Sequence, residues 1–481
     1  MGATTLLTPR ARLLLTHGAA VIAFAGGVYA TALGDDMRTG PVLILLGTAV
    51  PLLVVAQPWR FPWWLLTLAV ALPVGVAIVA ITHGDAHGIG RMGKFAYFGA
   101  LLLGVSGWAR TPTRRVVLAG AILLLGVLQF LWSMEQWLAG HDIRISVYGL
   151  IGWHNQLADF ELVPWALGLC LVALGVSALR ARSAVRTAVL LIVAASAGAA
   201  GAAILLSGSR FGLGLAACAL AAALLLTFLA HRGRALIPTL AWIALTTAIA
   251  FGLMVLMRSE LFFPTEAAEQ FDQATAIRAL DRGLSTDDNS FRTRLEMWGA
   301  ALRMGATSPA AGVGLLRFIE FERCLVAEGT GLFWHPHNEW LYAWAEGGLS
   351  LLLPLLALTA GLIVLGVRSL RPFPGAPQLR ADPARWGALV GLGAIAAAQM
   401  LEYDLAYPVL LALIAGTAGM CASPLIAAMR APGAHASLAS RVLAGMFALV
   451  VVGGAIALLI DPTLGEAPWL YWYHHPIADV C

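Results

Sequence analysis

The sequence predicts an all-α, polytopic integral membrane protein with about 12–13 transmembrane helices and one large helical loop between them. Hydrophobic residues make up 60% of the 481-residue chain and charged residues only 12%, a balance outside the range of soluble domains. Apolar stretches of about 20 residues, each long enough to cross a bilayer core, recur along almost the whole length. Arginines gather in alternate connections between these stretches, which indicates a chain that crosses a membrane many times.

The helices are expected in a regular succession from the N-terminus. The first apolar stretch follows Arg10 and Arg12 and lacks a clear small-residue cleavage site, so we expect a retained helix and not a signal peptide. If one span is only half inserted, the count is twelve; otherwise it is thirteen. The expected spans are residues 14–33, 41–57, 63–82, 95–109, 116–137, 157–179, 187–207, 211–230, 235–257, 338–367, 386–403, 407–429 and 442–460.

These spans divide the chain into four segments. Residues 1–257 hold nine helices, 258–337 form the large loop, 338–460 hold the last four helices, and 461–481 form a short tail. Within the loop, Glu266 to Arg282 and Phe291 to Met304 carry apolar residues at helical spacing. A connection this long, with helices of its own, is more often functional than a mere link.

The arginine pattern predicts the orientation. By the positive-inside rule the Arg-rich connections and the N-terminus face the cytoplasm. The large loop and the tail then lie outside, in the periplasm if the protein sits in a Gram-negative inner membrane. The intervening connections are poorer in Arg and contain Asp35, Asp36, Asp85, Asp142 and Asp404. The Arg-rich connections hold Arg60; Arg110, Arg114 and Arg115; Arg180, Arg182 and Arg186; Arg232 and Arg234; Arg368, Arg371, Arg380 and Arg385; and Arg430 and Arg441.

Polar side chains gather on the external side in three places. They are the run from Tyr148 to Gln156, which contains His154 and Asn155, the tight turn from Ser207 to Arg210, and the run from His335 to Glu339. Far-separated segments that meet at one depth are what an active site at a membrane interface requires. Arg91, Lys94, Arg292 and Arg294 add positive charge at the same level.

Each of these features also has a plainer structural explanation. Arg210 would snorkel to the interface or bind a lipid headgroup. Arg292 and Arg294 would form ordinary ion pairs with Glu296 or Asp288. His154 would be a hydrogen-bonded interfacial residue, and the same explanation applies to His337.

A metal site at His335, His337 and Glu339 is disfavoured. Side chains two residues apart on a helix point in different directions, and Pro336 prevents a regular helix there. We therefore expect no metal and no cofactor. Cysteines give no metal-type spacing either; Cys324 and Cys481 both lie in external polar segments, where an oxidising compartment would allow a disulfide between them.

Taken together, three sequence motifs resemble the O-antigen ligase and polymerase superfamily. Ser207-Gly208-Ser209-Arg210 is similar to its S-R turn, and Arg292 and Arg294 with Trp298, Pro309, Gly312 and Gly314 are similar to its R…W…P-x-x-G-x-G stretch. His337-Asn338-Glu339-Trp340-Leu341 and Glu346-Gly347-Gly348 are similar to its H-N-x-(Y/W)-L…E-x-G motif. Order, spacing and the large external loop agree over about 150–360.

The resemblance implies a metal-independent, inverting glycosyltransferase of the integral-membrane type. It would transfer O-antigen from undecaprenyl diphosphate to a sugar hydroxyl of lipid A–core, among membrane lipids and with no nucleic-acid partner. Sister branches glycosylate protein or polymerise O-antigen. The run His154-Asn155-Gln156-Leu157-Ala158 resembles an element of the protein-glycosylating branch, whereas the large soluble C-terminal region common there is missing after residue 461.

Two site residues receive catalytic roles from this interpretation. His337 would be the base, since an imidazole with an ordinary pKa near about 6.5 is neutral at working pH and can accept a proton. Asn338 or Glu339 would orient its ring. Arg210 would hold the leaving diphosphate, with Arg294, Arg292, Lys94 and Arg91 as weaker candidates for donor or acceptor phosphates.

The contrasting class is a transporter of lipid-linked glycan. A transporter would carry ionisable residues and broken helices in mid-membrane. The expected spans are nearly free of charge, and Glu135, Glu161 and Glu346 all lie near expected helix ends. The sequence therefore favours an enzyme that acts on one side of the membrane.

Overall fold

The structure is a computed structural model, and it confirms an all-α membrane architecture. It describes residues 63–85, 87–138, 151, 154–175, 183–231, 236–257, 289–325, 333, 335–370, 382–402, 405, 407–429 and 442. The expected helices at 14–33, 41–57 and 266–282, nearly all of 442–460, the tail and the Cys324–Cys481 pairing lie outside the described residues.

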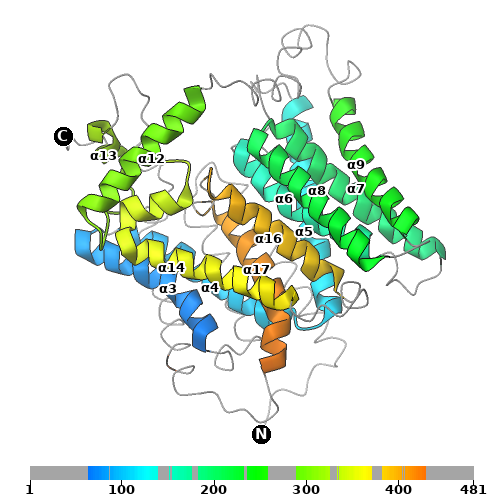
Figure 1. The fold of residues 1–481 in the computed structure, drawn as a ribbon, viewed down its shortest axis with the longest axis horizontal. Coiled ribbons are helices and arrows are strands. Elements are labelled where there is room, and N and C mark those ends of the chain that lie inside the picture. Colours follow the sequence, from blue (N-terminus) through cyan, green and yellow to red (C-terminus); the bar gives the residue numbers. More distant parts are fainter. Residues whose placement is uncertain are drawn as a thin grey trace.

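Within that part of the chain every regular element is a helix (Figure 1). Seven helices, α3, α5, α6, α7, α8, α9 and α14, are long and apolar enough to cross a membrane, and α17 contains a shorter apolar stretch at Val409–Pro424. The helices are α3 (Trp63–His83), α4 (His87–Trp108), α5 (Pro112–Leu138), α6 (His154–Gly175), α7 (Ser183–Ser207), α8 (Arg210–Ala230), α9 (Leu236–Met257), α12 (Asn289–Thr307), α13 (Phe318–Leu325), α14 (Glu339–Leu370), α16 (Pro383–Ala398) and α17 (Pro408–Met429).

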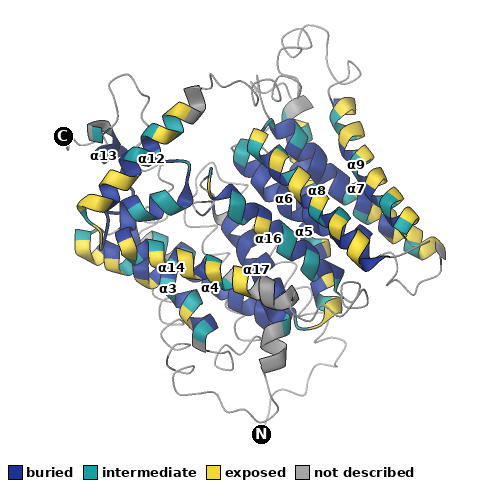
Figure 2. Cartoon of the chain, viewed as in Figure 1, coloured by how far each residue is buried: buried dark blue, intermediate teal, exposed yellow. Residues whose placement is uncertain are grey.

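The helices form one bundle around α6. Helix α6 packs against α7, α8 and α16. Helix α16 packs against α17, and α17 packs against α4. Helix α4 packs against α3, which in turn packs against α14. In Figure 2, α6 is almost entirely buried, whereas α8 and α9 show long exposed faces. Those faces are apolar, with Leu225, Ile237 and Val255 among their exposed side chains. Such helix faces are stable against lipid and not against water.

Two helix boundaries differ from the expected ones by more than four residues. Helix α4 begins at His87 and not at 95, so Arg91 and Lys94 lie inside the helix, not before it. Three glycines in this stretch disfavour helix locally, but the contacts that Arg91 makes with α14 outweigh that propensity. Helix α16 ends at Ala398 and not at 403, and a tight turn carries Glu402 out of the helix.

Helix α14 is broken at Gly348, which has a φ of 54°. A break removes helical hydrogen bonds, and buried backbone groups must find other partners. Residues of the loop that follows α12 supply these partners across the break. Helix α12, predicted at 291–304, runs from Asn289 to Thr307. The bonds are Val313 N–H to Ala345 O (2.9 Å), Gly314 N–H to Glu346 O (3.1 Å), Leu349 N–H to Pro309 O (2.8 Å) and Ser350 N–H to Ala310 O (3.1 Å).

Glycine is required on both sides of this junction. A Cβ on Gly348 would lie 2.5 Å from Pro309 O, and a Cβ on Gly312 would overlap the backbone of Glu346 and Gly347. Both residues also have a positive φ, which glycine adopts at no steric cost. The two glycine-containing elements of the sequence therefore form one interlocked joint, which fixes α14 relative to α12.

The two ends of the bundle are chemically different. At one end, where α5 and α16 begin, Arg115 forms a buried, two-point ion pair with Asp382, with N–O distances of 2.6 and 3.0 Å. Its guanidinium also donates to the carbonyl of Ala109 at 2.8 Å. At the opposite end, where α6 and α14 begin and α16 ends, the polar side chains predicted from sequence come together.

Candidate active site

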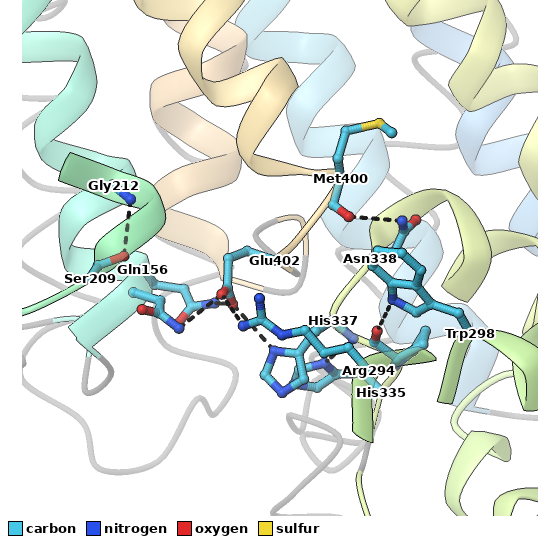
Figure 3. Close-up of polar contacts among 12 residues, drawn as sticks. Gln156, Ser209, Gly212, Arg294, Trp298, His335, His337, Asn338, Met400 and Glu402 are labelled. Carbon is cyan, nitrogen blue, oxygen red and sulfur yellow. Dashed lines mark hydrogen bonds and ion pairs between the residues drawn. The ribbon is translucent and has the colours of Figure 1, made fainter. Parts of the chain in front are cut away.

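The candidate site is built around the loop that leads into α14. As Pro336 predicts, the chain is not helical here, and α14 begins only at Glu339. The indole N–H of Trp298 on α12 donates to the carbonyl oxygen of Pro336 at 2.9 Å, which ties the loop to α12 (Figure 3). His337 has a φ of 48°, a backbone conformation that non-glycine residues seldom adopt. Such strain is held in place at functional sites by surrounding contacts.

A buried carboxylate, Glu402, organises the site. We name Glu402 and the four side chains bound to it the Glu402 cluster. Glu402 is 3% exposed, and its partners come from the start of α6, from α12 and from the loop before α14 (Figure 3). Its contacts are Asn155 Nδ2 (2.8 Å) and Arg294 (3.1 Å) on Oε1, and His337 Nδ1 (3.3 Å) and Gln156 Nε2 (3.4 Å) on Oε2.

The contact with Glu402 sets the orientation of the His337 ring. A carboxylate on Nδ1 holds the imidazole in one orientation and favours the tautomer with the proton on Nδ1. The other ring nitrogen, Nε2, is then the atom left to accept a proton from a substrate. The His337 side chain is 18% exposed and Arg294 is 21% exposed, so both can reach a molecule outside the protein.

His335 is a neighbour of this ring. The two imidazole rings lie 4.3 Å apart, and His335 Nδ1 accepts a hydrogen bond from the His337 backbone N–H at 3.2 Å. Burial lowers the pKa of His335 well below its ordinary value of 6.5, and the nearby His337 and Arg294 lower it further. His335 is therefore neutral and supports the conformation of the loop.

Asn338 and Glu339 do not orient the His337 ring, which differs from the expectation. Asn338 caps α14, since its Oδ1 accepts from the Leu341 N–H at 3.0 Å and its Nδ2 donates to Met400 O at 2.9 Å. Glu339 turns away and accepts from the Leu405 N–H at 3.4 Å. His335, His337 and Glu339 thus do not converge on one point, and no metal-type group of three such side chains occurs in the described residues.

Arg210 begins α8 at the same end of the bundle. Ser209 caps the helix, its hydroxyl accepting from the Gly212 N–H at 3.2 Å, and Gly212 packs directly on Ala158 of α6. This places the turn beside the start of α6, which supplies Asn155 and Gln156 to the Glu402 cluster (Figure 3). The Arg210 side chain is exposed. A cation at a helix N-terminus is unfavourable for the helix, so its placement favours a role with an anion.

The remaining predicted residues do not bind Glu402 directly. His154 is the first residue of α6, beside Asn155, and is close enough to Glu402, His337 and Arg294 to interact with them electrostatically. Arg292 is 82% exposed and forms a surface pair with Glu296 at 3.5 Å, as its plainer explanation predicts. Arg91 binds Glu346 at 2.6 Å and the Tyr342 hydroxyl at 2.7 Å. Lys94 is buried and lines a pocket next to Arg91.

Glu402 is a candidate site residue that the sequence interpretation missed. It lies inside the expected apolar span at 386–403, where a carboxylate is costly unless it has partners. A carboxylate inside an apolar span is therefore the sequence feature that points to Glu402. The partners themselves come from positions 155, 294 and 337, and nothing in the local sequence pairs them with position 402.

Comparison with known proteins agrees with this geometry. Residues 194–356 match the family model described as O-antigen ligase. The matched segment runs from α7 into α14 and includes Arg210, Arg294, Trp298 and His337, whereas Glu402 lies beyond it. No curated protein matches the chain. Residues 194–356 of this multi-pass membrane protein are therefore similar to the O-antigen ligase family.

Proposed function

We propose that the protein transfers O-antigen polysaccharide from undecaprenyl diphosphate to a sugar hydroxyl of lipid A–core, at the periplasmic face of the inner membrane. The observation that carries this proposal is the contact between His337 Nδ1 and Glu402, in a loop whose strained backbone is held by α12. A base held this way is what the activation of a sugar hydroxyl needs.

In the proposed reaction His337 is the general base. The acceptor hydroxyl oxygen attacks the anomeric carbon of the donor sugar, and its proton passes to His337 Nε2. A new carbon–oxygen bond forms as the bond to the diphosphate breaks, and undecaprenyl diphosphate leaves with the bonding electrons. Glu402 stabilises the imidazolium that forms on His337 and keeps its ring in place, as a carboxylate does behind a catalytic histidine.

Arg210 is assigned to the departing diphosphate. Its guanidinium stays charged and can bind two phosphate oxygens at once. It begins α8, so the positive end of the helix dipole adds to the positive potential. Arg294 donates one hydrogen bond to the Glu402 carboxylate. We assign its guanidinium to the diphosphate as well.

A protein acceptor is the second candidate. It is favoured by Asn155 and Gln156, which belong to the run that resembles the protein-glycosylating branch and which bind Glu402 directly. Transport of lipid-linked glycan is a third class. It is favoured by Glu161, an ionisable residue that was expected near a helix end but is fully buried two turns inside α6. Both classes are therefore included in the test.

The test incubates purified protein with a lipid-linked glycan and rough lipopolysaccharide, with a pilin acceptor in parallel. Glycan is expected on lipopolysaccharide and not on pilin, and His337→Ala should lower the rate by about 10²–10⁴-fold while donor binding persists. Near-normal transfer by His337→Ala would remove the proposed base. Glycan on pilin alone, or movement of the donor across a liposome bilayer without transfer, would contradict the proposed reaction.

A further inference from the structure

A pocket that is open to solvent lies between α3, α4 and α14, with about 650 Å³ of space when the solvent at its mouth is included. Its wall is apolar where Leu72 and Val76 on α3 face Leu351 and Leu355 on α14. Its other end is polar and contains the side chains of Arg91, Lys94, Glu339, Tyr342 and Glu346. Both halves of the broken helix α14 line the pocket, so the joint at Gly348 shapes it.

The polar end holds one cation without a counter-ion. Lys94 is 8% exposed, and no hydrogen bond or ion pair joins its ammonium to another described residue. Arg91, one helical turn earlier, is already neutralised by Glu346 at 2.6 Å and also donates to Tyr342. A buried ammonium without a partner is costly, and an anionic group in the pocket would offset that cost.

The apolar wall beside Lys94 indicates which kind of anion would bind in the pocket. Lys94 lies seven residues into α4, about 10 Å along the helix axis from its start. The apolar wall continues along α3, a helix long and apolar enough to cross a membrane. A small hydrophilic anion would leave that wall unoccupied, whereas a lipid phosphate would place its headgroup on Lys94 and its chain along the wall.

The pocket and Arg210 lie on opposite sides of the Glu402 cluster. Figure 1 shows α3, α4 and α14 on one side of the bundle and α6 to α9 on the other. Glu339, two residues after His337, lines the pocket, whereas Asn155 and Gln156 on the far side of Glu402 belong to α6, on which α8 packs. A reaction between two lipid-anchored molecules needs two separate lipid sites, one on either side of the base.

We propose that the Lys94 pocket binds the phosphate headgroup and adjoining chain of a lipid, and that this lipid is the acceptor of the transfer reaction. The first part concerns binding alone. The second part rests on the proposed function, in which Arg210 on the other side of His337 holds the donor.

Lipid binding to the purified full-length protein tests the first part. The probes are monophosphoryl lipid A, the same lipid without its phosphate, undecaprenyl monophosphate and inorganic phosphate, measured by native mass spectrometry. Monophosphoryl lipid A should bind, and Lys94→Met should weaken it about tenfold, the loss expected of one charge-assisted hydrogen bond. Lys94→Arg should keep most of the affinity, and inorganic phosphate should not bind detectably.

The controls separate charge from fold. Arg303→Met removes an exposed cation from α12 and should leave binding unchanged. Val76→Phe should weaken the binding of both forms of the lipid, because the larger side chain fills the apolar part of the pocket. Equal binding of the phosphorylated lipid by wild type and Lys94→Met, or equal affinity for the two forms of the lipid, would overturn the proposal.

The assignment to the acceptor is tested in the transfer assay. Lys94→Met should raise the KM for the lipid acceptor about tenfold and leave the KM for the lipid-linked donor unchanged. If undecaprenyl monophosphate binding or the donor KM responds to Lys94→Met instead, the pocket belongs to the donor and the acceptor assignment is wrong. If wild-type protein shows no transfer at all, the proposed function fails while the binding experiment still decides the pocket.

Discussion

Glu346 and Glu402 are both buried carboxylates at the same end of the bundle, and both bind an arginine. Glu346 is 1% exposed and is saturated: Arg91 lies at 2.6 Å, and the backbone N–H of Phe318 donates to its other oxygen at 3.3 Å. Glu402 is 3% exposed, and its four partners lie at 2.8–3.4 Å. Two of them, Arg294 and His337, carry or can acquire charge; they are about as exposed as Arg91, so the two carboxylates differ in the type and distance of their partners.

The difference separates a structural ion pair from a reactive one. A carboxylate paired at short distance with one permanent cation fixes the relative position of helices, and removal of either partner leaves the other charge uncompensated. A carboxylate in contact with an imidazole can stabilise the charge that appears on that ring during a reaction. The surroundings, and not the residue type, therefore assign Glu346 to the fold and Glu402 to the site.

The largest expected effect is on folding. Glu346→Ala would leave Arg91 buried without its counter-ion, and we expect a loss of about 3–5 kcal/mol in the free energy of unfolding. Glu402→Ala should cost less, because its contacts with Arg294 and His337 are longer, at 3.1 and 3.3 Å. Thermal unfolding in detergent measures both, with Glu296→Ala in the exposed α12 pair as a control near zero. Equal losses for Glu346 and Glu402 would remove the distinction.

Arg210 and Arg91 extend the comparison to the cations. Because Arg210 is exposed, we expect Arg210→Ala to lower transfer about 10²-fold with little change in melting temperature. Arg210→Lys should recover only part of the rate, since lysine lacks the planar fork that binds two oxygens. Initial rates at saturating acceptor measure this. Full recovery with lysine would indicate that charge alone matters at this position.

The joint beside Glu346 predicts a smaller but selective loss. Gly348→Ala should destabilise the protein by about 1–3 kcal/mol from backbone strain alone, before its overlap with Pro309 O is counted. Gly120→Ala in α5 is the matched control, since a Cβ there meets nothing within 4 Å, and it should be neutral or stabilising. If the two alanine variants have the same melting temperature, the joint does not fix α14.

The smallest effect concerns pH and the loop before His335. Glu322 on α13 accepts from the Phe333 N–H at 2.7 Å, and burial raises its pKa from 4.5 to about 7, although that hydrogen bond acts against the rise. Between these two values the folded protein binds more protons than the unfolded chain, so stability is highest at low pH and falls as pH rises through about 7. From pH 6 to pH 8 the loss should be about 1 kcal/mol.

Melting temperatures of wild type and Glu322→Gln across this range check the sign. Glutamine keeps an oxygen for the Phe333 N–H but does not titrate. Wild type should lose stability relative to Glu322→Gln as pH rises from 6 to 8. A wild type that gains stability over that range would contradict the assignment of the buried carboxyl.

Sequence patterns predicted most of the fold because lipid imposes a simple rule. Apolar length located the described membrane helices to within a few residues, and Pro336 correctly excluded a helix before Glu339. Arg292 and Asn338 were candidates that the contacts explain as a surface pair and a helix cap. In both cases the residue type permits several roles, and only its neighbours select one.

What could not be predicted depends on contacts between distant segments. The start of α4 at His87 depends on contacts of Arg91 with α14, 251 and 255 residues away in sequence. The end of α16 at Ala398 releases Glu402 to meet three other segments. Periodicity does not encode such pairings, because they contribute no repeat to the local sequence.

The central claim is that Glu402 acts through His337, and a double-mutant cycle tests it most directly. Transfer rates of wild type, Glu402→Gln, His337→Gln and the double variant are measured with the same lipid-linked donor and acceptor. The account predicts a loss of about 10²-fold for Glu402→Gln alone and almost no further loss when His337 is already replaced. Losses that multiply, so that Glu402→Gln costs as much without His337 as with it, would contradict the claim.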